Sequence, residues 1–196
     1  MMEKLLLAEA RTINSKISSI AATRYGNVMA SRGSVIPLFI NQIQSGLEIT
    51  ITDPKMTRFM MSLEEAVLLV KHSFINAENG DIFVRKSPAV TIENLVYALC
   101  EVMNKPKHPV RIIGTRHGEK LFESLLSREE MALASDDGDY FRIPMDNRDH
   151  NYTTFIAEGN ENVTEAYEYS SHNTEQLSVN EMIKLLKNLP YIQSFL

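Results

Sequence analysis

The stretch EITITDPKMTRFMMSLEEAVLLVKHSFINA (48–77) places a strand signal and a helix signal next to each other. Residues 48–52 alternate polar and apolar side chains, which is the period of a half-buried strand, and Asp53-Pro54 ends it. Ser62 opens an S-L-E-E capping box, which predicts a helix that runs to about Ala77. One apolar face of that helix is marked at helical spacing by Leu63, Val67, Val70 and Phe74.

Similar signals surround this stretch. Strands are predicted at 18–28, 81–86 and 109–115, the first and last of them buried, and a helix at 34–46 that tolerates Pro37 and closes at Gly46. Thr91 caps another helix, whose inward positions are Ile92, Leu95, Val96, Leu99, Val102 and Met103. Capping boxes at Ser127 and Ser178 open later helices. Strands and helices alternate through about residue 115, which predicts an α/β chain with parallel strand pairing.

The last 60 or so residues differ from this pattern. They are polar, irregular and rich in tyrosine, which indicates an appended lobe or arm rather than another strand–helix unit, and disorder is the alternative. Apolar anchors that need a packing partner are Tyr140, Phe141, Ile143, Tyr152, Phe155 and Ile156.

Composition narrows the class of protein. The chain has 196 residues, 44% hydrophobic and 23% charged, and no apolar run approaches the roughly 20 residues of a membrane span. The net charge of −5 gives no overall attraction to nucleic acid. One cysteine, Cys100, fits a reducing cytoplasm, and it lies on an apolar helix face, so we expect it in the core. The five histidines have no metal-site spacing, so no metal is expected.

The first 14 residues, MMEKLLLAEARTIN, read as a helix already under way, without a cap in front of it. A signal peptide needs an unbroken apolar stretch of roughly 7–15 residues. Glu9 and Arg11 interrupt this one after four apolar residues. The remaining interpretations are an ordinary N-terminal helix or a chain that begins inside a larger fold.

Three stretches carry more polar chemistry than a core requires. In TRYGNVMASRGSVIPLF (23–39), a strand end leads through Asn27, Arg32, Gly33 and Ser34 into a helix. Ligands bind at such positions in α/β sheets, and a helix N-terminus favours anions. The structural alternative is a strand-to-helix loop with a cap.

The second stretch, DPKMTRFMMSLEEAV (53–67), places Arg58 among methionines and Phe59. Such an arginine needs an anionic partner. The partner is either an internal carboxylate such as Glu64 or Glu65, or a phosphate, whose oxygens match the guanidinium fork.

The third stretch, IGTRHGEKLFESL (113–125), offers Arg116 for a phosphate and Glu119 for vicinal hydroxyls such as those of a ribose. The alternative is a surface ion pair between the two, worth well under about 1 kcal/mol. No G-x-G-x-x-G, P-loop or nucleophile elbow is present in the sequence.

Together these three stretches closely resemble the UDP-N-acetylglucosamine 4,6-dehydratases of capsule and O-antigen synthesis, of the type that inverts C5 of the sugar. These enzymes are extended short-chain dehydrogenase/reductases, and the resemblance runs from Met1 through YSSHNTEQL (169–177) almost to the end. It implies the C-terminal portion of an NAD(P)-binding Rossmann-like fold. In that reading, residues 1–135 are a truncated core interleaved with a substrate-binding lobe, and residues 136–196 are a family-specific extension. The cofactor loop and the catalytic helix motif would then precede residue 1, so no catalytic residue is assigned and the chain alone is expected to be inactive.

The resemblance also implies roles for individual residues. Asn27 would contact the sugar diphosphate, and Arg32 and Ser34 would line the same entrance. Arg58 and Arg116 would hold the UDP pyrophosphate, and Glu119 the uridine ribose. Tyr25 would lie near the nicotinamide of NADP, the cofactor of the family.

The implied partners are a UDP-sugar and further copies of the chain, in the cytoplasm, with neither nucleic acid nor a membrane span. Two other functions stay open. One is 4-epimerisation of a UDP-sugar within the same superfamily, and the other is a non-catalytic partner of a full-length dehydratase. We also expect the isolated chain to associate with itself, because a sheet cut after its first half exposes an edge strand and apolar faces.

Overall fold

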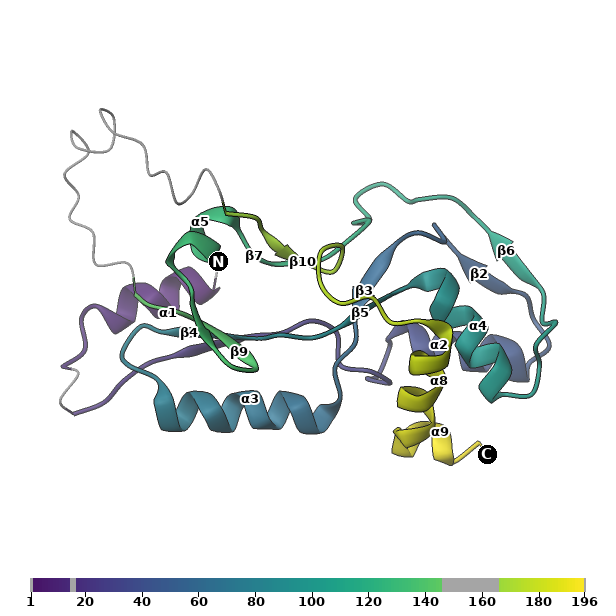
Figure 1. Cartoon of the computed structure of the whole chain (residues 1–196), viewed down its shortest axis with the longest axis horizontal. Helices are drawn as coiled ribbons and strands as arrows, with labels where there is room; N and C mark the ends of the chain where they lie inside the picture. Colours follow the sequence, from purple (N-terminus) through teal and green to yellow (C-terminus); the bar gives the residue numbers. More distant parts are fainter. Residues whose placement is uncertain (1, 15–16, 146–165, 196) are drawn as a thin grey trace. The chain divides into compact units, whose positions relative to one another are not determined.

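The computed structural model describes residues 2–14, 17–145 and 166–195 (Figure 1). The chain forms two compact units, each assembled from three separate stretches. Unit 1 comprises Met1–Tyr25, Glu64–Lys86 and Ser124–Tyr169, and unit 2 comprises Gly26–Leu63, Ser87–Glu123 and Ser170–Leu196. In the part of the chain that the structure describes, no helix has the length and apolar character needed to cross a membrane.

A four-stranded sheet in the order β1-β4-β9-β8 organises unit 1. The elements of this unit are α1 (Met2–Ala10), β1 (Ala22–Arg24), α3 (Leu63–Asn76), β4 (Ile82–Arg85), β7 (Ser124–Leu126), α5 (Arg128–Leu133), β8 (Ser135–Asp137) and β9 (Tyr140–Ile143). Strands β1 and β4 run parallel, with Thr23 opposite Phe83, whereas β9 is antiparallel to both β4 and β8. Strand β7 forms a separate two-stranded sheet with β10 (Tyr169–Ser170).

Two expectations for this unit need correction. The strand predicted at 18–28 is present only as β1, and it is half-buried rather than buried. The segment expected to be irregular contributes β9, because Tyr140 and Ile143 pack into the unit when the strand pairs with β4. Tyr152, Phe155 and Ile156 lie outside the described residues.

Helix α3 begins directly after Ser62, as predicted, but the apolar face that the sequence indicated is exposed to solvent. Its side chains Leu63, Val67 and Phe74 are 67%, 59% and 87% exposed, and Val70 is also exposed. The buried face carries smaller residues, including Ala66 and Ser73, together with Leu69. Leu69 packs on Phe83 of β4 and Tyr140 of β9, so the sheet selects the face that is covered.

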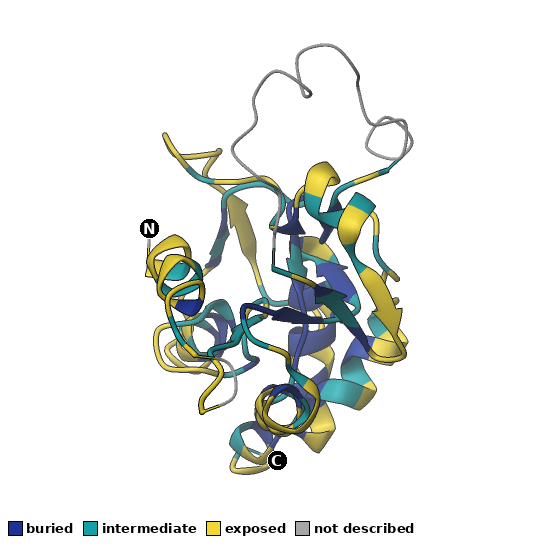
Figure 2. Cartoon of the chain, turned by 90° about the vertical axis from the view of Figure 1, so that its left-hand side faces the viewer, coloured by how far each residue is buried: buried dark blue, intermediate teal, exposed yellow. Residues whose placement is uncertain are grey.

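Arg24 at the end of β1 joins three elements of unit 1. Its guanidinium donates to Glu3 of α1 at 2.9 Å, to Glu130 of α5 at 2.8 Å and to the carbonyl oxygen of Leu125 at 2.7 Å. Glu130 also completes the capping box that Ser127 was predicted to open. Helix α1 needs this tie, because its only buried residue is Ala10 and most of the helix is exposed (Figure 2).

In its described residues, unit 2 packs four helices around two short sheets. Its elements are α2 (Val35–Gln44), β2 (Ile49–Ile51), β3 (Thr57–Phe59), β5 (Ala89–Thr91), α4 (Ile92–Val102), β6 (Val110–Ile112), α8 (Val179–Asn188) and α9 (Pro190–Gln193). Strands β2 and β6 are parallel, and β3 and β5 are antiparallel. With the parallel β1–β4 pair of unit 1, this arrangement confirms the predicted α/β class.

Local signals account for the helices of unit 2. Pro37 lies in the first turn of α2, and Gly46 follows its end with φ +68°, a left-handed conformation that glycine adopts without strain. The hydroxyl of Thr91 caps α4 by accepting from the Asn94 N–H at 3.2 Å. The predicted inward residues of α4 are buried except Met103, which is partly buried, and Cys100 is buried as expected. Ser178 opens α8 with the predicted capping box.

The strand predicted at 109–115 needs a further correction. It is β6, which is exposed along its length rather than buried, with Val110 and Ile112 41% and 62% exposed. The two-stranded sheet that it forms with β2 gives it one neighbouring strand, and the core of unit 2 lies on α2, α4 and α8 instead.

Candidate functional site

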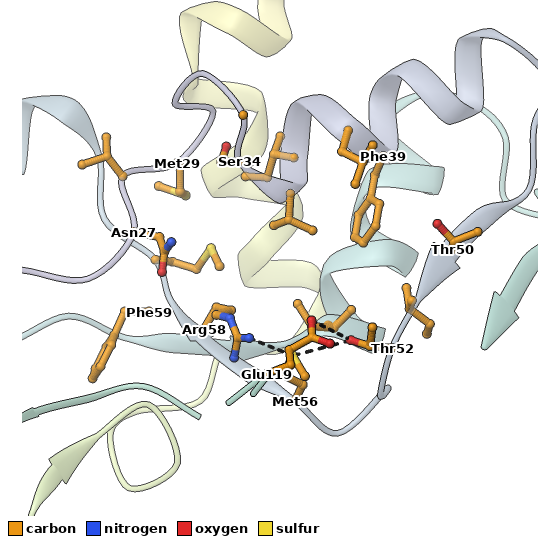
Figure 3. Close-up of a pocket in the computed structure, with 18 of the residues that line it drawn as sticks. Asn27, Met29, Ser34, Phe39, Thr50, Thr52, Met56, Arg58, Phe59 and Glu119 are labelled. Atoms are coloured by element: carbon orange, nitrogen blue, oxygen red, sulfur yellow. Dashed lines mark hydrogen bonds between the residues drawn. The ribbon is translucent and has the colours of Figure 1, made fainter. Parts of the chain in front are cut away.

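A cavity of about 320 Å³ lies within unit 2 and gathers most of the residues singled out from the sequence. Figure 3 shows Asn27, Ser34, Arg58 and Glu119 around it. Asn27 lies in the loop before α2, and Ser34 is the residue directly before that helix. Arg58 belongs to β3, and Glu119 lies in the segment after β6. Arg116 lines the same cavity.

The wall of the cavity is apolar where the helices meet the strands. Phe39 and Ile36 come from α2, Ile51 from β2, and Met56 and Ile92 from the segments that begin β3 and α4. All five are buried. An apolar wall with a few convergent polar groups is the usual form of a small-molecule site.

Ser34 occupies the N-cap position of α2, but its side chain makes no capping hydrogen bond. Its hydroxyl oxygen is buried and has no hydrogen-bond partner among the described residues, and Ser34 lines the cavity. The first turn of α2 has backbone N–H groups without helical acceptors, and together with the helix dipole these favour an anion. A ligand oxygen would give the Ser34 hydroxyl a hydrogen-bond partner. The alternative, in which Ser34 only caps the helix, leaves the hydroxyl without one.

Arg58 is held by contacts within unit 2. Its guanidinium donates to the carbonyl oxygens of Thr57 at 2.7 Å and Lys120 at 3.0 Å. The internal carboxylate nearest to it is Glu123, 3.8 Å from Nε. The sequence had suggested Glu64 or Glu65 for this role, and for Glu65 the structure shows an ion pair with Arg85 at 3.0 Å.

Glu119 is positioned by two hydrogen bonds. The hydroxyl of Thr52, directly after β2, donates to Glu119 Oε1 at 3.2 Å, and the backbone N–H of Arg116 donates to Oε2 at 3.3 Å. The Arg116–Glu119 contact is therefore made by the Arg116 backbone. In this arrangement the exposed guanidinium of Arg116 can reach a ligand, and so can the carboxylate of Glu119.

Two of the predicted residues lie elsewhere. Arg32 is exposed and outside the cavity lining. Tyr25 belongs to unit 1 and is 45% exposed. The sequence contains no glycine-rich G-x-G-x-x-G turn that could hold a dinucleotide pyrophosphate. Tyr25, the residue expected near the nicotinamide, is not among the residues that line the cavity.

Sequence reasoning missed Glu123 and the polar groups behind it. With its nitrogen facing this carboxylate, the Asn27 amide donates to Glu123 Oε2 at 2.7 Å. Burial raises the pKa of Glu123, and Arg58 opposes this shift. The hydroxyl of Ser171, which is fully buried, bonds the Thr57 hydroxyl at 2.8 Å, and the Glu123 backbone N–H donates to it at 2.9 Å. Glu123 could have been identified from the sequence, because it follows Glu119 by four residues. Ser171 could not, because no sequence pattern near it indicates a contact with the site.

Comparison with known protein families gives two adjoining matches. Residues 1–145 match the model described as "Polysaccharide biosynthesis protein", and residues 146–193 match "Polysaccharide biosynthesis protein C-terminal". A curated protein named UDP-glucose 4-epimerase from Rickettsia rickettsii (strain Sheila Smith) is 56% identical over 193 residues, which is 98% of this chain and 56% of that protein. A protein of the same name from Rickettsia akari (strain Hartford) is also 56% identical, with the same coverage. The chain thus spans about half the length of these relatives.

Solved structures of other proteins also match this chain. The X-ray structure of Pen from Bacillus thuringiensis matches with a TM-score of 0.79 and 33% identity, over 95% of this chain and 54% of that chain. DesIV, a dTDP-glucose 4,6-dehydratase from Streptomyces venezuelae, matches with a TM-score of 0.52 at 19% identity, over 61% of this chain and 38% of that chain, and so bears on the fold alone. The neighbours have the Rossmann-like fold of extended short-chain dehydrogenase/reductases, which confirms the predicted fold class. Because the family models cover the chain from residue 1 to residue 193, this chain belongs to the polysaccharide biosynthesis protein family.

Proposed function

We propose that these 196 residues form the UDP-sugar-binding part of a nucleotide-sugar 4,6-dehydratase that acts on UDP-N-acetylglucosamine in polysaccharide biosynthesis. The observation that carries the proposal is the cavity of unit 2, where an apolar wall, a helix N-terminus, two arginines and a positioned carboxylate converge. A nucleoside diphosphate has matching chemistry, because its phosphates attract cations and its ribose hydroxyls donate to a carboxylate.

In this proposal Arg116, Arg58 and the start of α2 hold the diphosphate, and Glu119 accepts from the ribose hydroxyls. Asn27, Ser34 and the nearby Arg32 line the entrance. The positions of Arg116 and Glu119 support the assignment best, since both line the cavity and Glu119 already has two donors that fix its carboxylate.

The reaction proposed for the whole protein is oxidation at C4 of the sugar, loss of water across C5 and C6 with inversion at C5, and reduction at C6. The cofactor proposed for it is NADP, with Tyr25 near the nicotinamide. No step of this reaction is assigned to a residue of the present chain.

UDP-glucose 4-epimerase is the second candidate, because the curated relatives that are 56% identical carry that name. Both reactions begin with oxidation at C4, so both need the UDP moiety to be bound in the same position. Dehydration yields a product lighter by one water, whereas epimerisation leaves the mass unchanged. Mass spectrometry and sugar chromatography of a reaction that contains the whole protein, NADP and either UDP-sugar therefore separate the two, whereas this chain alone is expected to convert neither sugar.

Ligand binding tests the proposal directly. Calorimetry of the purified chain should detect binding of UDP-N-acetylglucosamine, and Arg116→Ala should weaken it about tenfold, the loss of one charge-assisted contact. Arg111→Ala is the matched control, because Arg111 is also an exposed arginine of unit 2 but lies outside the cavity lining and faces Glu48, 3.6 Å away. Absence of binding, or an equal loss in both variants, would contradict the proposal.

A further inference from the structure

The guanidinium of Arg58 is already engaged on all three nitrogens. Nη1 donates to the Thr57 carbonyl at 2.7 Å, Nη2 to the Lys120 carbonyl at 3.0 Å, and Nε faces Glu123 Oε1 at 3.8 Å. The guanidinium fork binds a phosphate best through two parallel N–H donors. Nη1 also lies 3.5 Å from the Leu121 carbonyl oxygen, and Nη2 lies 2.8 Å from the Met56 sulfur. A ligand phosphate can therefore use Arg58 in that way only by replacing some of these acceptors.

The same carboxylate engages a second residue of the cavity. The Asn27 amide donates to Glu123 Oε2 at 2.7 Å. Asn27 and Arg58 both line the cavity, whereas Glu123 is outside the lining. Two groups assigned to the sugar diphosphate are thus joined through one anion behind them.

The backbone of Glu123 is held in place by Ser171. Its backbone N–H donates to the Ser171 hydroxyl at 2.9 Å, and its carbonyl oxygen accepts from the Ser171 N–H at 2.8 Å. Ser171 also donates to the Thr57 carbonyl at 3.2 Å, the same oxygen that Arg58 uses. Residues 57, 58 and 123 are consequently fastened to one another through a residue of the C-terminal segment.

We propose that Glu123 is a positioning residue, a built-in counter-ion of Arg58 that a bound diphosphate has to displace. The inference rests on the proposed function. The order of events follows from the contacts: the diphosphate takes over the Nε side of Arg58, and the Asn27 amide is released from Glu123 toward the ligand. Because its negative charge opposes an anionic ligand, Glu123 lowers affinity and makes binding sensitive to pH.

The electrostatic setting of Glu123 supports this pH dependence. Burial raises its pKa, while Arg58, the backbone N–H of Phe59 and Lys120 act in the opposite direction. As the pH falls, Glu123 gains a proton at a higher pH than an ordinary glutamate and stops competing for Arg58. His172 bonds the Thr57 hydroxyl at 2.9 Å and stacks on Phe122, so it is a second ionisable side chain near the site.

The test compares Glu123→Gln with the wild type in calorimetric titrations of UDP-N-acetylglucosamine and of inorganic pyrophosphate. Glu123→Gln keeps the acceptor for Asn27 and removes the charge, so both ligands should bind about three- to tenfold more tightly, as expected when one partly buried like charge is lost. Glu101→Gln is the matched control, because Glu101 is an exposed glutamate on α4, away from the cavity lining, and it should change nothing. Thermal melts check that each variant folds.

The pH profile separates this role from a purely structural one. Burial raises the pKa of Glu123, so wild-type affinity for the sugar nucleotide should rise as the pH falls and this carboxylate gains a proton. The profile should flatten in Glu123→Gln, which keeps His172, and persist in Glu123→Asp, which keeps the charge. Unchanged or weaker binding by Glu123→Gln, or an unchanged pH profile, would overturn the inference.

The two ligands distinguish the inference from the function on which it rests. Tight UDP-N-acetylglucosamine binding that ignores Glu123 would leave the proposed function standing and remove the counter-ion role. Pyrophosphate binding that depends on Glu123, without binding of the sugar nucleotide, would do the reverse. If neither ligand binds, both proposals fall.

Discussion

Replacing Thr52 with valine should weaken uridine nucleotide binding without touching the ligand directly. The change keeps the shape of the side chain and removes the hydroxyl that donates to Glu119 Oε1 at 3.2 Å. Glu119 then keeps only the Arg116 N–H, at 3.3 Å, as a positioning donor. Hydrogen bonds to charged groups contribute about 1.5–3 kcal/mol, and this long, partly exposed one belongs at the low end. A loss of about 1.4 kcal/mol corresponds to about tenfold weaker binding.

Calorimetry with UDP and with 2′-deoxy-UDP measures this effect and locates it. If Glu119 accepts from the ribose, the wild type prefers UDP, and Thr52→Val loses most of that preference because the carboxylate is no longer held in place. Thr50→Val is the matched control. Thr50 lines the same cavity two residues away, but its hydroxyl accepts from Gln42 at 2.9 Å.

The two valine variants can contradict this prediction. Thr50→Val should bind UDP within about twofold of the wild type. If Thr52→Val also binds within this limit, or retains the full preference for UDP over the deoxy nucleotide, Thr52 does not position Glu119 for the ribose. If both variants lose affinity equally, the effect belongs to the strand and not to the hydrogen bond.

Three further predictions concern stability, association and reactivity. Arg24→Met should lower the free energy of unfolding by about 2–3 kcal/mol, because Glu3 and Glu130 lose their shared cation. Arg24 lowers the pKa of Glu130 in the folded state, so this stabilisation is present above the unfolded pKa and should disappear in urea titrations as the pH falls below about 4. An equal loss at neutral and acid pH would refute the ion pair as its cause. Val67→Ser with Phe74→Ser should reduce self-association in light scattering, since these side chains are 59% and 87% exposed on α3, and unchanged association would contradict this role. Cys100 should react slowly with a thiol reagent until the chain unfolds, because the side chain is buried and burial raises its thiol pKa, and equal rates before and after unfolding would exclude that environment.

Element type could be predicted from the sequence wherever neighbouring residues determine it. The cap at Thr91 and the boxes at Ser127 and Ser178 are present, because each depends on a side-chain oxygen and a backbone N–H only three residues apart. The alternating residues around Ile49–Ile51 form a strand for a similarly local reason. Burial was less predictable, as α3 shows, because the choice of face depends on where Phe83 and Tyr140 lie.

The same distinction between local and long-range contacts applies to the candidate site. By itself the sequence singled out seven binding residues, of which Asn27, Ser34, Arg58, Arg116 and Glu119 line one cavity and Tyr25 and Arg32 do not. Only the tertiary structure decided what holds them. Among the described residues, the carboxylate that pairs with Arg58 is Glu123, 65 positions away along the chain, rather than Glu64 or Glu65. Hydrogen bonds and ion pairs act over a few ångströms of space, and local sequence patterns do not specify which distant segments the fold brings within that range.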